Sequence, residues 1–86
     1  MTAGPFPSWG AKRRPVTAER IADAFRLWAR RTGADTGMSD CSVYKQPGEW
    51  CVRAYYPMTY AEHQDYRVRR GTGGQTVDGF DFVREP

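Results

Sequence analysis

Residues 17–32 are the only stretch of the chain in which apolar side chains recur with the period of an α-helix. At about 100° per residue, the apolar side chains fall on one face and the charged side chains on the other. Thr17 suits the N-cap, and Gly33 suits the position after the last turn, where glycine tolerates a positive φ. The apolar face consists of Ala18, Ile21, Ala22, Ala24, Phe25, Trp28 and Ala29. Its alanines would let the helix lie close to a sheet. Trp28 is interpreted as a core residue rather than as a platform for stacking bases.

The core of this chain has to be built mainly from aromatic residues. Ile21 is the only isoleucine and Leu27 the only leucine, whereas the 86 residues include three tryptophans, five tyrosines and four phenylalanines. Aromatic side chains bury about 150–250 Å² each, so a few of them replace many aliphatic residues. A chain of this length predicts one domain.

Two short alternating runs around Pro47-Gly48 predict a β-hairpin in residues 41–56. Pro-Gly favours a type II turn, which suits a two-residue hairpin loop poorly, so we predict a four-residue loop over residues 46–49. The strand pleat then divides the hairpin into two faces. One face carries Val43, Trp50, Val52, Ala54 and Tyr56, and the other carries Tyr44, Cys51, Arg53 and Tyr55.

The two cysteines are predicted to be free thiols. In this register Cys41 lies opposite Ala54, and Cys51 lies opposite Tyr44. The pleat therefore places the two thiols on opposite faces, whereas a disulfide needs converging Cβ vectors. A three-residue loop would reverse this parity.

A second hairpin is predicted in the C-terminal third of the chain. Tyr66 and Val68 alternate with Arg67 and Arg69, which is typical of a strand with its arginines pointing away from the helix. The glycine-rich segment at residues 71–75 then turns the chain.

The return strand is predicted over residues 76–83. Val77 is out of phase with Phe80 and Phe82, and a bulge at Gly79 would bring it into register. Residues 57–64 are predicted as a connection, in which Thr59 would cap a single helical turn. These elements predict an α+β fold in which one amphipathic helix packs on a three- to four-stranded antiparallel β-meander.

Residues 1–15 are predicted to form an extended basic arm ahead of a single domain at 16–86. Pro5, Pro7 and Pro15 oppose a helix there. The arm carries Trp9, Lys12, Arg13 and Arg14. Two interpretations stay open: a tail held by Trp9 against the core, or a basic arm that orders on a partner.

The candidate binding site is the sheet face turned away from the helix. Arginines interleaved with tyrosines can contact a protein or stack bases and hold phosphates. The bland alternative is a solvated back face. The site residues predicted are Arg53, Tyr55, Arg67, Arg69, Arg70 and Tyr44, with Trp9, Lys12, Arg13 and Arg14 from the arm.

Catalytic, metal-binding and cofactor-binding motifs are not recognised. Gly71, Gly73 and Gly74 lack the spacing of a dinucleotide or phosphate loop, and a strand rather than a helix follows them. His63 with two cysteines is too small a set for a zinc site. The neighbouring Glu62, His63 and Asp65 give no sign of meeting around a substrate, and Asp78 and Asp81 are interpreted as polar strand positions rather than metal ligands. We therefore expect no enzyme activity, no cofactor and no metal.

The sequence favours a small protein-binding module, for example an inhibitor or adaptor encoded by a phage or other mobile element. Its net charge of +3 fits several partners, namely nucleic acid, an acidic protein surface or none, and we expect an acidic protein surface more than nucleic acid. The alternative is a DNA- or RNA-binding module that uses the same arginines and the arm, although Asp65, Asp78 and Asp81 would dilute such a patch. We expect a monomer or an edge-strand dimer. No apolar run approaches about 20 residues and no signal-peptide core precedes the helix, so a cytoplasmic protein without a membrane partner is expected.

Overall fold

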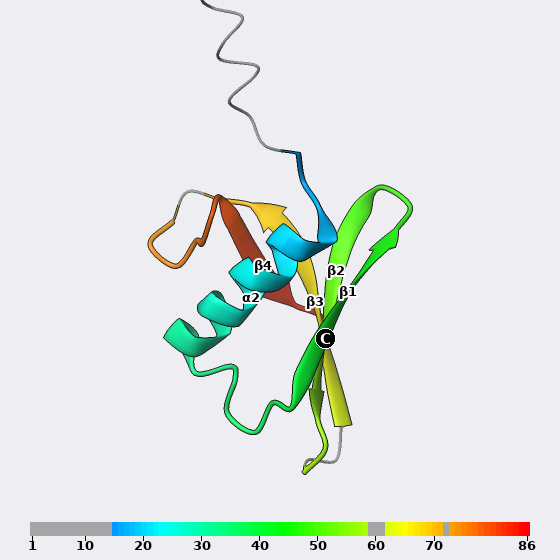
Figure 1. Cartoon of the computed structure of the whole chain (residues 1–86), viewed down its shortest axis with the longest axis vertical. Helices are drawn as coiled ribbons and strands as arrows, with labels where there is room; N and C mark the ends of the chain where they lie inside the picture. Colours follow the sequence, from blue (N-terminus) through cyan, green and yellow to red (C-terminus); the bar gives the residue numbers. More distant parts are fainter. Residues whose placement is uncertain (1–14, 59–61, 72) are drawn as a thin grey trace, which may run out of the picture.

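The computed structural model describes residues 15–58, 62–71 and 73–86. The arm residues Trp9, Lys12, Arg13 and Arg14 and the predicted helical turn at Thr59 lie outside these ranges. The described elements are helix α2 (Ala18–Thr32) and the strands β1 (Asp40–Gln46), β2 (Glu49–Tyr56), β3 (Glu62–Arg70) and β4 (Phe80–Arg84). The strands form one antiparallel sheet in the order β1-β2-β3-β4, and α2 packs on one face of it (Figure 1). The predicted α+β meander is confirmed.

Helix α2 begins and ends as its sequence predicts. Thr17 has an extended backbone, and its hydroxyl accepts a hydrogen bond of 3.1 Å from the Arg20 amide. Gly33 takes φ 85°, the left-handed conformation that stops a helix at low cost when the residue is glycine. Glu19 in the first turn and Arg30 and Arg31 in the last turn complement the helix dipole.

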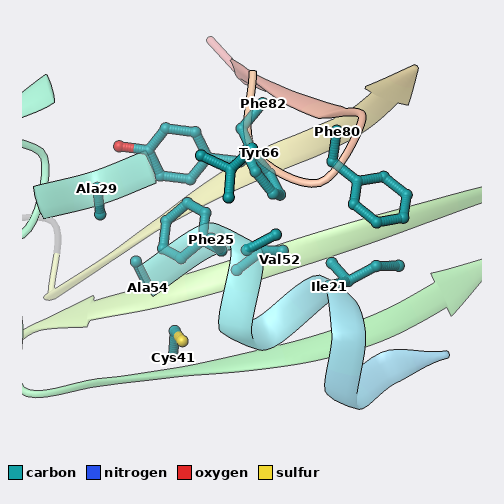
Figure 2. Packing of buried hydrophobic residues seen from close by; sticks show 11 residues of the cluster. Ile21, Phe25, Ala29, Cys41, Val52, Ala54, Tyr66, Phe80 and Phe82 are labelled. Carbon is teal, nitrogen blue, oxygen red and sulfur yellow. The ribbon is translucent and has the colours of Figure 1, made fainter. Parts of the chain in front are cut away.

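The core lies between α2 and the sheet and is largely aromatic (Figure 2). Phe25 is fully buried, and its ring centroid lies 5.0 Å from that of Tyr66 and 5.1 Å from that of Phe82. Trp28 extends this cluster, 5.5 Å from Tyr66 in a T-shaped arrangement. These rings join the helix to β3 and β4, and Ile21 and Val52 complete the fully buried centre. The prediction that Phe25 and Trp28 belong to the core is confirmed.

The β1–β2 hairpin has the predicted register but a shorter loop. Val43 pairs with Val52, and pairing continues to Gln46 and Glu49. The loop is therefore the two residues Pro47-Gly48, and the prediction of a four-residue loop is wrong. Gly48 takes φ 84°, the positive φ that a type II turn requires at this position. The tip of this hairpin pairs with no third strand, so its twist can adapt to the less favourable turn type.

The cysteines are free and lie on opposite faces of the sheet. Cys41 pairs with Ala54, and Cys51 pairs with Tyr44, as the predicted register requires. Burial raises the pKa of both thiols.

The segment before β4 differs from the prediction. Val77 and Phe80 exchange two backbone hydrogen bonds of 2.9 Å across a two-residue turn, Asp78-Gly79. Asp78 has φ 55° and Gly79 has φ 80°, which is the pattern of a type I′ turn and matches its preferred Asp-Gly sequence. A tight turn, and not a bulge, therefore buries Val77, and β4 begins only at Phe80. Strand β3 also begins earlier than predicted, at Glu62.

Candidate binding face

The sheet face turned away from α2, here called the outer face, has no described element over it (Figure 1). The strand pleat places on it five of the six predicted sheet residues: Tyr44, Arg53, Tyr55, Arg67 and Arg69. The sixth, Arg70, lies on the opposite face. Its guanidinium lies 5.0 Å from the centroid of the Phe80 ring, beside the core. Tyr66, Val68 and Arg70 share one side of β3, so Arg70 is an exposed residue on the helix-facing side of the sheet, and its role in binding stays a prediction.

Arg53 is held in place by Asp65 on the neighbouring strand. These two residues are direct cross-strand partners. Arg53 donates from Nε to Oδ1 at 2.7 Å and from Nη2 to Oδ2 at 3.0 Å, a two-point contact that fixes the guanidinium plane. The same guanidinium lies 5.6 Å from the centroid of the Tyr44 ring. Hydrogen bonding from Arg53 lowers the pKa of Asp65, so the carboxylate stays ionised near neutral pH.

Arg67 is paired with two carboxylates. Its Nε donates to Glu85 at 2.8 Å and lies 3.7 Å from an oxygen of Glu49. Hydrogen bonding with Glu85 and the charges of both glutamates raise the pKa of Arg67. Arg69 differs from Arg53 and Arg67 because it has no ion-pair partner within the described ranges, although it pairs through the backbone with Asp81. Among the three outer-face arginines, Arg69 alone has no described carboxylate partner, so its charge is available to a binding partner.

The two tyrosines of the outer face have different roles. Tyr44 lies across from Cys51, which is buried on an otherwise open face. Burial is the main cause that raises the pKa of Tyr44. Tyr55 is 39 % exposed, and its hydroxyl lies 3.3 Å from that of Ser42. Tyr55 therefore offers the accessible aromatic surface of this face.

The outer face is an interleaved set of charges rather than a basic stripe. Arg53, Arg67 and Arg69 lie among Glu49, Asp65, Asp81 and Glu85. The sequence predicts that Asp65 and Asp81 dilute a basic patch, but it does not single out Glu49 and Glu85. The signal for the Arg53–Asp65 pair is the β2–β3 register. Once Val52 is paired with Tyr66, Arg53 and Asp65 face each other. Such a surface has fixed polar groups of both signs, which suits a partner with a matching pattern.

The other predicted chemistry can be placed as well. His63 and Asp65 share the outer side of β3, and Asp78 forms an ion pair of 3.0 Å with Arg20. Within residues 15–58, 62–71 and 73–86, no group of three or more His, Cys, Asp or Glu side chains is arranged to hold a metal ion. In the same part of the chain, no helix has the length and apolar character needed to cross a membrane.

Comparison of the chain with protein-family models, with curated proteins and with solved structures finds no match.

Proposed function

We propose that the protein is a small protein-binding module that contacts its partner through the outer face of the sheet. The observation that carries this proposal is the fixed arrangement of Arg53, Asp65 and Tyr44 beside the exposed Tyr55. Ordered side chains lose little entropy on binding, and Tyr and Arg are enriched among the residues that dominate protein interfaces.

The charge pattern favours a protein partner over nucleic acid. Affinity for nucleic acid comes mainly from cations that neutralise phosphates. On the outer face Arg53 and Arg67 are already paired with carboxylates at 2.7 Å and 2.8 Å. Phosphate binding would have to break these pairs and would bring phosphates close to Asp65 and Glu85. As the sequence suggested, the proposed role is that of an inhibitor or adaptor encoded by a phage or another mobile element.

The test compares two single substitutions of matched exposure. Tyr55 is 39 % exposed on the outer face, and Leu27 is 37 % exposed on α2. The tagged protein is used to capture partners from a nuclease-treated extract of the source organism, and binding of the purified partner is then measured by calorimetry. We expect Tyr55→Ala to weaken binding by about 30-fold or more, the effect of losing an interface hot spot. Leu27→Ala should leave the affinity unchanged.

Two results would overturn the proposal. If the wild type and Tyr55→Ala bind the partner with equal affinity, the outer face is a solvated surface and not the binding site. Micromolar or tighter binding to duplex DNA or RNA at about 150 mM salt would instead favour the nucleic-acid module. The affinity should then fall by about three decades between 50 and 200 mM salt, because about six phosphate contacts give a salt dependence of that size.

A further inference from the structure

The sheet divides at the end where α2 begins. Pairing between β2 and β3 stops at Cys51 and Arg67, although β2 continues to Glu49 and β3 continues to Arg70. Beyond this point β2 stays paired with β1, and β3 stays paired with β4. Figure 1 shows the two hairpins spreading apart there, with the start of α2 between them. The facing backbones of Glu49–Trp50 and Val68–Arg70 are consequently not paired with each other.

A pocket of about 200 Å³ lies in this division. Its apolar part is formed by the side chains of Val16, Trp50, Val68 and Phe80. Gly48, Glu49, Arg69 and Arg70 complete the lining. These eight residues are here called the fork pocket. Lys45 adds a further positive charge nearby, since its Nζ lies 5.0 Å from the centroid of the Trp50 ring.

The charges of the fork pocket favour an anion. Its only acid, Glu49, lies 3.7 Å from Arg67 on the outer face, which offsets its charge. Neither Arg69 nor Arg70 has an ion-pair partner in the described part of the chain. Arg70 is positioned over the Phe80 ring at 5.0 Å. The guanidinium of Arg70, which has no carboxylate partner among the described residues, therefore stands at the edge of an apolar, partly aromatic pocket.

We propose that the fork pocket binds an aromatic side chain of a partner polypeptide whose neighbouring residue carries a carboxylate. The ring would contact the apolar lining, and the carboxylate would pair with Arg70. A peptide is favoured over a nucleotide because the facing edges of Glu49–Trp50 and Val68–Arg70 are not paired with each other, and an extended chain can pair with such edges. This proposal rests on the proposed protein-binding role but uses a different surface from the outer face.

The direct test is an NMR titration of the isotope-labelled full chain with a short synthetic peptide that has one central tryptophan flanked by aspartates. We expect the largest amide shifts at Gly48–Trp50 and Val68–Arg70. Arg70→Gln should weaken binding by about fivefold, the effect of losing one exposed ion pair. Arg30→Gln is the matched control, because Arg30 is an exposed arginine on α2 outside the pocket lining. It should bind like the wild type.

Further probes separate the parts of the proposal. A peptide with asparagines in place of the aspartates should bind more weakly, and a peptide with alanine in place of tryptophan should cause no shifts. Equal weakening by Arg70→Gln and Arg30→Gln would overturn the proposal, because it would show general charge attraction. Tighter binding of a short oligothymidine to the same amides would overturn the choice of a polypeptide. Tyr55→Ala should leave the titration unchanged, so failure of the outer-face proposal is distinguishable from failure of this one.

Discussion

The arginines of the outer face differ in what surrounds each of them. Arg53 makes two hydrogen bonds to Asp65, Arg67 contacts Glu85 and Glu49, and Arg69 has no ion pair with any described residue. Arg67→Glu would place a third carboxylate beside Glu85 and Glu49, whereas Arg69→Glu would not. Residues that look equivalent in an alternating run are therefore not equivalent as sites for substitution.

At the residue scale, the Arg53–Asp65 pair predicts a pH-dependent stability. Hydrogen bonding from Arg53 makes the pKa of Asp65 lower in the folded than in the unfolded chain. The stabilisation is then complete above the ordinary aspartate pKa of about 3.9 and is lost as the pH falls through the lower folded value. The wild type should have a higher urea midpoint than Asp65→Asn at pH 7, and the difference should shrink as the solution is acidified below about pH 4.

The control for this measurement is Asp23→Asn. Asp23 forms an exposed pair with Arg26 on α2 at 3.7 Å, which is expected to contribute little to stability. This variant should follow the wild-type curve at each pH. A constant difference between wild type and Asp65→Asn down to strongly acidic pH would show that the ion pair is not the cause.

At the element scale, the β1–β2 loop and the turn before β4 depend on different residues. The β1–β2 loop contains one residue with a positive φ, Gly48, whereas the turn before β4 contains two, Asp78 and Gly79. Asp78 also pairs with Arg20 at 3.0 Å, which ties this turn to the first turn of α2. Arg20 lies 5.2 Å from the centroid of Phe80 on the same side of the sheet. The turn therefore helps to position the start of β4 under the helix.

Gly79→Ala should destabilise the protein by about 1–2 kcal/mol, the cost of a left-handed backbone at a residue with a Cβ. Backbone strain is the expected cause because the nearest atom to an added Cβ is Arg70 Nη1, at an ordinary contact distance of 3.6 Å. Gly74→Ala is the control, since an added Cβ there meets no atom within 4 Å. The free energy of unfolding from urea titration checks both variants. A cost below about 0.5 kcal/mol for Gly79→Ala would mean that the turn rearranges.

At the scale of the whole molecule, one aromatic core joins the helix to the sheet. Phe25 from α2 contacts Tyr66 of β3 and Phe82 of β4 within the same cluster (Figure 2). In the described ranges, Ile21, Ala24 and Ala29 of α2 belong to the same core cluster. Neither layer has a second core of its own, so we expect helix and sheet to unfold together.

Phe25→Ala should cost about 3–5 kcal/mol, because it removes a fully buried ring and leaves a cavity. The unfolding curves measured by far-ultraviolet circular dichroism and by tryptophan fluorescence should move together to lower denaturant. Leu27→Ala, which changes an exposed residue on the same helix, should cost less than about 1 kcal/mol. Separation of the two curves in the wild type would contradict a single cooperative core.

Local sequence patterns were sufficient to predict much of this fold. The bounds of α2 follow from Thr17, Gly33 and the helical period, because capping and amphipathicity depend only on neighbours along the chain. The register of the first hairpin and the opposite faces of the cysteines follow from a turn at Pro47-Gly48 and the two-residue pleat. The same pleat was sufficient to place Arg70 on the helix-facing side of the sheet, opposite to Arg67 and Arg69.

Only the tertiary structure decided which groups of distant segments meet. The contacts Arg53–Asp65 and Arg67–Glu85 join residues from different strands, and Arg20–Asp78 joins a helix to a turn. The point where β2 and β3 separate, which creates the fork pocket, depends on how far each hairpin follows its own twist. Such contacts are set by packing and strand pairing across long sequence separations. Local spacing therefore predicted the face of each outer residue, but not the carboxylate that restrains it or the pocket that lies beside it.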